Sequence, residues 1–243
     1  MATHVQHRTA AAHWRADFER HAGRHRDVIV AGIEPPPAWP ALGPSLAVFQ
    51  LGETGSGSKL FAAARRIGCD HDQVAALELF IGEEQEHARL LSMVLSELDT
   101  PLASAHWTDR VFVLARQAFG YRGEVLMLLV AEVVALAYYS TLRDGMDDDR
   151  LRDLFARIHA DEVRHVRFHA DTLPPLLCRW PSWQWWAGRG IWNLVVAGTS
   201  VVVGIGHRHA LRGARSSARR LIVTVNRLRI DQDAHLFTRS RPT

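Results

Sequence analysis

From Ser45 onward, apolar residues recur at the three- and four-residue steps of amphipathic helices. Strand signals are almost absent, because no alternating apolar runs are separated by Asn-Gly or Asp-Gly turns. The pattern predicts four long helices, at about 45–67, 72–98, 108–143 and 147–172, with a bend in the third at Gly120 and Gly123. Because the links between them are short, we expect an all-α, antiparallel four-helix bundle.

The two ends of the chain differ from this region. Residues 1–43 end in a proline-rich stretch that cannot sit inside a helix or a central strand, so we expect a short helix or arm and a connector. Residues 176–243 contain five of the eight tryptophans, an uncharged apolar run at 190–206, and the arginine-rich segment HRHALRGARSSARR. The expected organisation is therefore an N-terminal arm (1–43), a bundle (44–175) and a C-terminal helical extension (176–243).

Six acidic and histidine residues follow an ordered pattern along the predicted bundle. The chain reads E, E-x-x-H, E, E-x-x-H, and the residues are Glu53, Glu84, His87, Glu132, Glu162 and His165. The first two glutamates of each half are separated by 31 and 30 residues, so the two halves nearly match.

The spacing has a chemical meaning. Residues i and i+3 share one face of a helix, so each Glu–His pair can point at one metal ion. Mixed carboxylate and imidazole ligands suit divalent iron or manganese. Glu132 is the only charge in the run from Val125 to Leu142, and an unpaired buried carboxylate is costly unless it is neutral, paired with an arginine or bound to a metal. The central glutamate also argues against a membrane span there.

The pattern resembles the ferritin-like superfamily, which includes rubrerythrin-type proteins and carboxylate-bridged di-iron oxygenases. The resemblance covers about 45–172, and the segment DEVRH at 161–165 is similar to the [DE]-E-x-R-H motif of di-iron monooxygenases. EEQEH at 83–87 matches more loosely, because Glu86 replaces the arginine. The C-x-x-C tail of rubrerythrins is absent, and ferritin itself lacks the tryptophan-rich extension.

The resemblance also implies roles for neighbouring side chains. Carried over from the family, Asp161 orients His87 and Glu83 orients His165 by hydrogen bonds. Tyr138 and Tyr139, about two turns after Glu132, have either a redox or hydrogen-bonding role or a place in the core. His169, one turn after His165, is either an extra ligand or an ordinary residue of an amphipathic helix.

The expected cofactor is a pair of iron ions, with two manganese ions or a mixed Mn/Fe pair as the alternatives. By resemblance, the protein is an oxidase or oxygenase that activates dioxygen or peroxide to oxidise an organic substrate. An external electron donor supplies the electrons for repeated turnover. The alternatives are an iron-storage protein, a di-iron tRNA hydroxylase and a manganese catalase.

Composition adds little to this picture. The net charge of +3 only weakly favours nucleic acid or anionic lipid as partners. The two cysteines, Cys69 and Cys178, form no metal-binding pair and suit a cytoplasmic protein, as does the lack of an apolar signal segment at the N-terminus. For the C-terminal extension we expect packing on the bundle, a homodimer interface or peripheral membrane contact, in preference to a membrane span.

Overall fold

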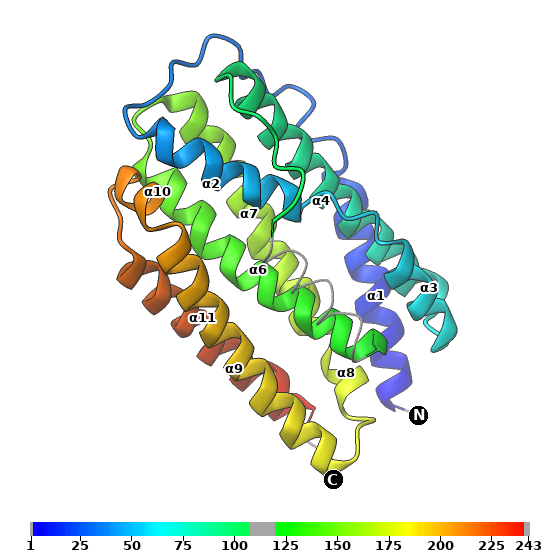
Figure 1. Cartoon of the computed structure of the whole chain (residues 1–243). Coiled ribbons are helices and arrows are strands. Elements are labelled where there is room, and N and C mark those ends of the chain that lie inside the picture. Colours follow the sequence, from blue (N-terminus) through cyan, green and yellow to red (C-terminus); the bar gives the residue numbers. More distant parts are fainter. Residues whose placement is uncertain (1, 107–119, 241–243) are drawn as a thin grey trace.

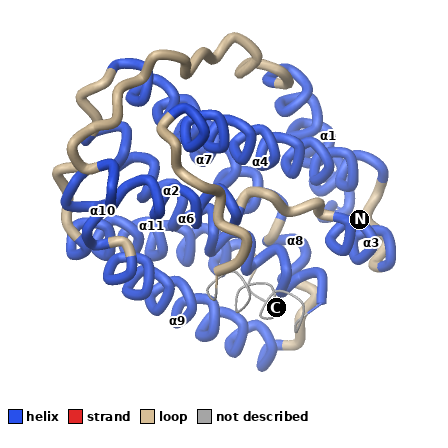
Figure 2. Tube along the Cα trace, turned by 45° about the horizontal axis from the view of Figure 1, so that its top comes forward, coloured by secondary structure: helices blue, strands red, loops and turns tan. Residues whose placement is uncertain are grey.

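A computed structural model describes residues 2–106 and 120–240, and within these ranges it is all-helical (Figures 1 and 2). The expected fold class, all-α, is therefore confirmed for this part of the chain. The helices are α1 (Ala2–His21), α2 (Trp39–Gly52), α3 (Ser58–Arg66), α4 (His71–Glu97), α6 (Gly120–Gly145), α7 (Asp149–Thr172), α8 (Pro174–Leu177), α9 (Ser182–Gly206), α10 (Arg208–Gly213) and α11 (Ala218–Arg239).

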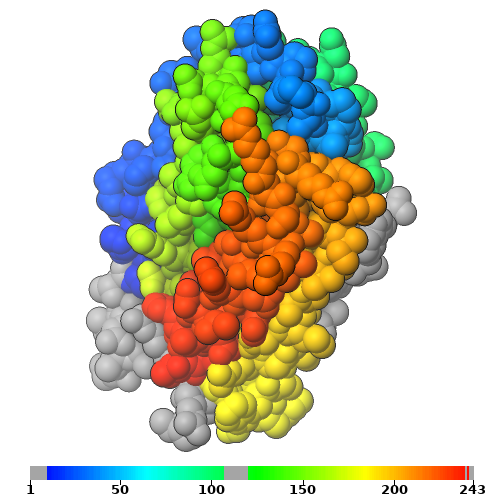
Figure 3. Space-filling view, turned by 90° about the vertical axis from the view of Figure 1, so that its left-hand side faces the viewer, coloured from blue at the N-terminus to red at the C-terminus, as the bar shows by residue number. Residues whose placement is uncertain are grey.

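The helices are arranged in three groups (Figure 1). On one side, α1 lies along α4, and α3 lies beside α4. In the middle, α6 packs along α7, while α2 contacts α4. On the other side, α9 and α11 pair with each other and both contact α6. Figure 3 shows the atoms of α11 (red) and α9 (yellow to orange) side by side on one face. The middle group lies between the other two and contributes fully buried side chains such as Tyr138, Tyr139 and Phe155.

Two of the long helices begin at strong side-chain caps. The carboxylate of Asp70 accepts from the amide of Gln73, whose side chain returns a bond to the Asp70 amide. This capping box satisfies two amides that the first turn of α4 would leave unpaired. Asp148 caps α7 with its side chain alone, by accepting from the amides of Arg150 and Leu151. These caps fix where the helices that carry the two Glu–His pairs begin.

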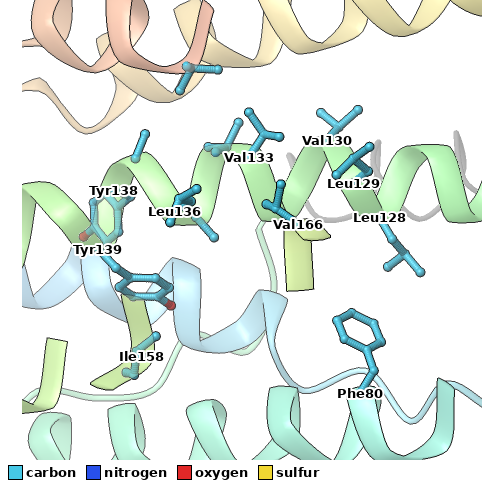
Figure 4. Close-up of a cluster of buried hydrophobic side chains, with 14 of the residues drawn as sticks. Phe80, Leu128, Leu129, Val130, Val133, Leu136, Tyr138, Tyr139, Ile158 and Val166 are labelled. Carbon is cyan, nitrogen blue, oxygen red and sulfur yellow. The ribbon is translucent and has the colours of Figure 1, made fainter. Parts of the chain in front are cut away.

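Helix α6 is the central helix of the core. Figure 4 shows Val130 and Val133 pointing toward one neighbouring layer and Leu128 and Tyr139 pointing toward the other. Two described helices, α6 and α9, are long and apolar enough to cross a membrane. The apolar window of α6 is 83% buried inside the protein, whereas that of α9 is only 22% buried. The apolar run around Glu132 thus belongs to a core helix. Helix α9 differs, because most of its apolar window is not buried inside the protein.

The structure differs from the expectation at the N-terminus. Helix α1 is twenty residues long and packs on α4 and α7 as part of the folded body. Its buried residues Ala11, Trp14 and Phe18 recur at helical spacing, and the rings of Trp14 and Phe18 contact Phe168 of α7. The proline-rich connector is also shorter than expected, because α2 begins at Trp39 and includes Pro44.

The prediction of one helix over 45–67 is wrong. The chain breaks between α2 and α3, and Gly57 there adopts a left-handed backbone conformation (φ 65°) that strongly favours glycine. The glycines of the segment LGETGSG also weaken a helix by about 1 kcal/mol each. Glu53 consequently lies at the C-terminal end of α2. The expected start of the third helix falls at 107–119, outside the described residues.

Candidate metal centre

The two Glu–His pairs lie on adjacent helices. Helix α4 carries Glu84 and His87, and α7 carries Glu162 and His165, each pair one turn apart. Helix α6 adds Glu132, and the end of α2 adds Glu53. Both histidines are fully buried, and Glu53, Glu132 and Glu162 are nearly so. The fold therefore gathers side chains from four segments of the chain in its interior.

The ligand-type atoms face one another across the interface between α4 and α7. Nδ1 of His165 lies 2.9 Å from Oε1 of Glu84 and 3.4 Å from Oε2 of Glu132. Nδ1 of His87 lies 3.3 Å from Oε1 of Glu162. One atom from each of Glu84, His87, Glu162 and His165 lies within 4.8 Å of every other, which is close enough for a shared metal ion.

In both histidines, the ring nitrogen that faces away from the cluster contacts a carboxylate. Nε2 of His87 donates to Oδ2 of Asp161 at 3.0 Å, and Nε2 of His165 donates to Oε2 of Glu83 at 3.0 Å. These are the contacts that the family resemblance implied. A carboxylate accepts hydrogen bonds, so it places the proton of a neutral imidazole on Nε2 and leaves a lone pair on Nδ1. In both rings, Nδ1 faces the cluster.

The same cluster contains buried polar atoms that lack hydrogen-bond partners. Among the described residues these are Nδ1 of His87 and His165, Oε1 of Glu84, and both carboxylate oxygens of Glu162. Buried polar groups in native proteins are nearly always satisfied, and an exception needs an explanation. Here the unpaired atoms are all of ligand type and converge on one place, so the residues present fit a metal ion.

The charges of the cluster also favour a bound cation. Burial, together with the neighbouring carboxylates, raises the pKa of Glu53 well above its usual value. Burial and the Glu162 carboxylate raise the pKa of Glu132 to about 8. Burial lowers the pKa of His165, but the proximity of the surrounding carboxylates outweighs burial and raises this pKa well above the ordinary value, so a bound metal would have to displace a proton from Nδ1. Like charges are thus crowded together, and cations would relieve their repulsion.

Asp161 has a larger set of partners than the sequence suggested. Its Oδ2 also accepts from Nε2 of His25 at 2.7 Å, and its Oδ1 accepts from Arg164 at 2.9 Å and contacts Arg24. Arg24 and His25 follow α1 in the segment that was expected to be an arm. The helical spacing of Trp14 and Phe18 could have revealed the packing of α1, but nothing in the sequence singled out His25 from the other histidines.

The two tyrosines occupy different environments. The hydroxyl of Tyr139 donates to Oε1 of Glu53 at 2.9 Å, so this residue touches the cluster directly. The hydroxyl of Tyr138 instead pairs with Ser45 at 2.7 Å, and Ser45 also pairs with His207 at 2.7 Å. Tyr138 therefore connects α6 to α2 and to the end of α9. Both side chains are fully buried.

His169 lies apart from the group of four. Its ring packs edge-on against Phe80 at 5.0 Å between ring centroids and is fully buried. Neither ring nitrogen has a hydrogen-bond partner among the described residues. Burial, with a smaller effect of the neighbouring His165, lowers the pKa of His169 to about 3, so the ring is neutral. His169 is thus a neutral histidine of the core that flanks the cluster.

Comparison of the chain with protein-family models, with curated proteins and with solved structures finds no match. The case for a metal centre therefore rests on the geometry, burial and chemistry of these residues.

Proposed function

We propose that α2, α4, α6 and α7 form a ferritin-like four-helix bundle that holds two iron ions, and that the protein is a di-iron oxidoreductase. The observation that carries the proposal is the convergence of unpaired ligand atoms in the interior, with both histidines fixed from behind. A buried structural ion pair would leave few such atoms unpaired. A centre built to hold cations accounts for all of them.

The six candidate ligands are enough for two ions. By the family resemblance, Glu53, Glu84 and His87 would hold one ion, and Glu132, Glu162 and His165 would hold the other. The four carboxylates carry four negative charges when ionised, which two divalent cations neutralise. This balance favours two ions over one, because one divalent ion would leave buried negative charge uncompensated.

The iron would supply the electrons that reduce dioxygen or peroxide, and the oxidising power would act on an organic substrate. The protein's own part is to fix and shield the site. Asp161 and Glu83 hold the imidazoles in one tautomer, and Tyr139 holds one oxygen of Glu53. The rings of Phe80 and Phe18 pack on His165, at 4.8 and 6.1 Å between centroids, and exclude water from that side. An external electron donor would sustain repeated turnover.

The test is the metal content of protein purified without added metal, measured by elemental mass spectrometry beside the Glu132→Ala/His165→Ala double variant. About two iron ions per chain, lost in the double variant, would support the proposal. Two manganese ions would instead favour a manganese enzyme, and no bound metal after anaerobic ferrous reconstitution would refute a metal centre.

A second measurement separates an oxidoreductase from an iron-storage protein. The iron-loaded protein is given excess ferrous iron and air, and the iron retained per chain is counted after gel filtration. An oxidoreductase retains about the two ions of its centre, and its oxygen consumption depends on an added reductant. Retention of many more ions per chain would favour storage and would contradict the proposed enzymatic function.

A further inference from the structure

Helix α9 turns three of its polar side chains, Arg189, Asn193 and Ser200, toward α11. Arg189 donates to Asp233 of α11 at 2.6 Å, and Asn193 donates to the same carboxylate at 2.6 Å. Ser200 accepts from Asn226 of α11 at 3.2 Å. A helix on the surface of a water-soluble domain usually shows its polar face to solvent. In α9 the paired polar groups lie against α11, so the outward face is left to apolar residues.

The outward face of α9 is a continuous apolar stripe. Trp183, Leu194, Val201 and Ile205 are separated by 11, 7 and 4 residues, so they share one side of the helix. Trp183 is 70% exposed and Leu194 74% exposed. Ile230 and Val223 of the neighbouring helix α11 are also exposed. In Figures 1 and 2, α9 lies at the outer edge of the molecule. Exposed apolar surface of this extent usually marks a binding face.

The charge beside this stripe is strongly positive. Five exposed arginines lie within 207–220, directly after α9, and this segment contains no acidic residue. The arginines are Arg208, Arg212, Arg215, Arg219 and Arg220, of which Arg215 pairs with Asp147. Residues 182–240 as a whole contain nine arginines and two aspartates. An anionic surface complements this charge, and tryptophan at the other end of the helix suits a lipid–water interface.

We propose that the outward face of α9 binds the surface of an anionic lipid membrane, with the helix lying in the plane of the interface. An in-plane orientation agrees with the packing, because Trp185, Trp192 and Val196 on the opposite face are buried in the protein. A spanning orientation would expose these core residues to lipid. A second copy of the chain fits less well as the occupant, because it carries the same positive charge.

The test is co-sedimentation of the full chain with vesicles of phosphatidylcholine alone and of phosphatidylcholine mixed with phosphatidylglycerol. The variant Leu194→Glu places a charge in the centre of the stripe. Its matched control is Ile29→Glu, because Ile29 is equally exposed, at 72%, but belongs to the connector between α1 and α2. Circular dichroism verifies that both variants fold, as expected for substitutions at exposed positions.

The proposal predicts binding to the vesicles that contain phosphatidylglycerol, weakened by added salt. Leu194→Glu should lower the partition coefficient by about tenfold or more, and Ile29→Glu should leave it unchanged. Equal binding of Leu194→Glu and the parent protein would overturn the proposal. Membrane binding that resists extraction with alkaline carbonate would also overturn it, because such resistance indicates a spanning helix. A protein that binds no vesicles but forms a dimer, which Leu194→Glu dissociates, would overturn it as well. The assay works equally with metal-free protein, so its outcome is independent of the proposed iron centre.

Discussion

One oxygen of Asp161 accepts hydrogen bonds from two imidazoles, His87 of α4 at 3.0 Å and His25 of the connector at 2.7 Å. His87 belongs to the candidate metal centre, whereas His25 belongs to a segment at the start of the chain. The carboxylate therefore ties the N-terminal region to the centre. Because its other oxygen contacts Arg164 and Arg24, its negative charge is well compensated although the side chain is fully buried.

We predict that Asp161→Asn weakens metal binding. The amide can no longer fix the Nε2 proton of His87 as a carboxylate does, so the lone pair on Nδ1 is less firmly aimed at the centre. We expect the affinity to fall about 10- to 100-fold, measured by competition with a chromophoric chelator. The matched control is Asp153→Asn on the same helix, whose carboxylate pairs with Arg157 on the surface. Unchanged affinity in Asp161→Asn would argue against the orienting role.

We predict that the metal-free protein loses stability between pH 6.5 and pH 8. The folded-state pKa of Glu132, about 8, lies above its ordinary value of 4.5, so the stabilisation is complete below pH 4.5 and is lost as pH rises through 8. His165 acts in the same direction, because its folded-state pKa is also raised. The pKa of His87, lowered to about 4, affects stability only below pH 6.5. The expected loss from Glu132 alone is on the order of 2 kcal/mol, measured by urea unfolding.

Glu132→Gln provides the control for this pH dependence. The amide has nearly the same shape but no proton to lose, so the metal-free variant should lose less stability over the same pH range. Addition of metal should reverse the trend in the parent protein, because ligands must be deprotonated to bind and the affinity therefore rises with pH. A parent protein whose metal-free stability is constant from pH 6.5 to 8 would contradict the assignment of a raised pKa to Glu132.

We predict that Tyr139→Phe destabilises the protein by about 1–3 kcal/mol, because it leaves Oε1 of Glu53 without its donor in a buried place. A double-mutant cycle with Glu53→Leu, which removes the acceptor oxygen, isolates this contact from the general effect of the substitution. A coupling energy of at least about 0.5 kcal/mol is expected from unfolding curves. Additive effects of the two substitutions would show that the hydrogen bond contributes nothing to stability.

We predict that Phe18→Ala lowers the free energy of unfolding by about 3–5 kcal/mol, because the ring is fully buried between α1 and α7. The neighbouring substitution Glu19→Ala, at an exposed position, should change it by less than about 0.5 kcal/mol. Equal effects of the two would mean that α1 does not pack on the body of the protein. Thermal or denaturant unfolding of metal-free protein separates this effect from metal binding.

Much of the centre could be predicted from sequence, because its signals are local. The spacing of Glu84 and His87, repeated at Glu162 and His165, is read directly from helical geometry. Glu132 stands out as a single charge in an apolar run, and the structure places it beside His165. The assignment of these residues as ligands remains a prediction, whereas their proximity is now a structural observation.

The remaining features depend on tertiary contacts that a local pattern does not contain. The partnership of His25 with Asp161 joins residues 136 positions apart. The outward apolar face of α9 could not be seen either, because composition alone does not tell which side of a helix packs on a neighbour. The break after Glu53 was signalled by its glycines, but helical periodicity on both sides of them outweighed that signal.

The placement of the two Glu–His pairs on α4 and α7 has a mechanical consequence. Glu84 and Glu162 are 78 residues apart in the chain, so an ion bound by both would be a cross-link that closes a long loop. Cross-links of this kind restrict the unfolded chain and slow its escape from the folded state, as a disulfide does, although this protein has only two cysteines and both are free thiols. The ion would thus act as a reversible cross-link, which a strong chelator would remove without a reductant.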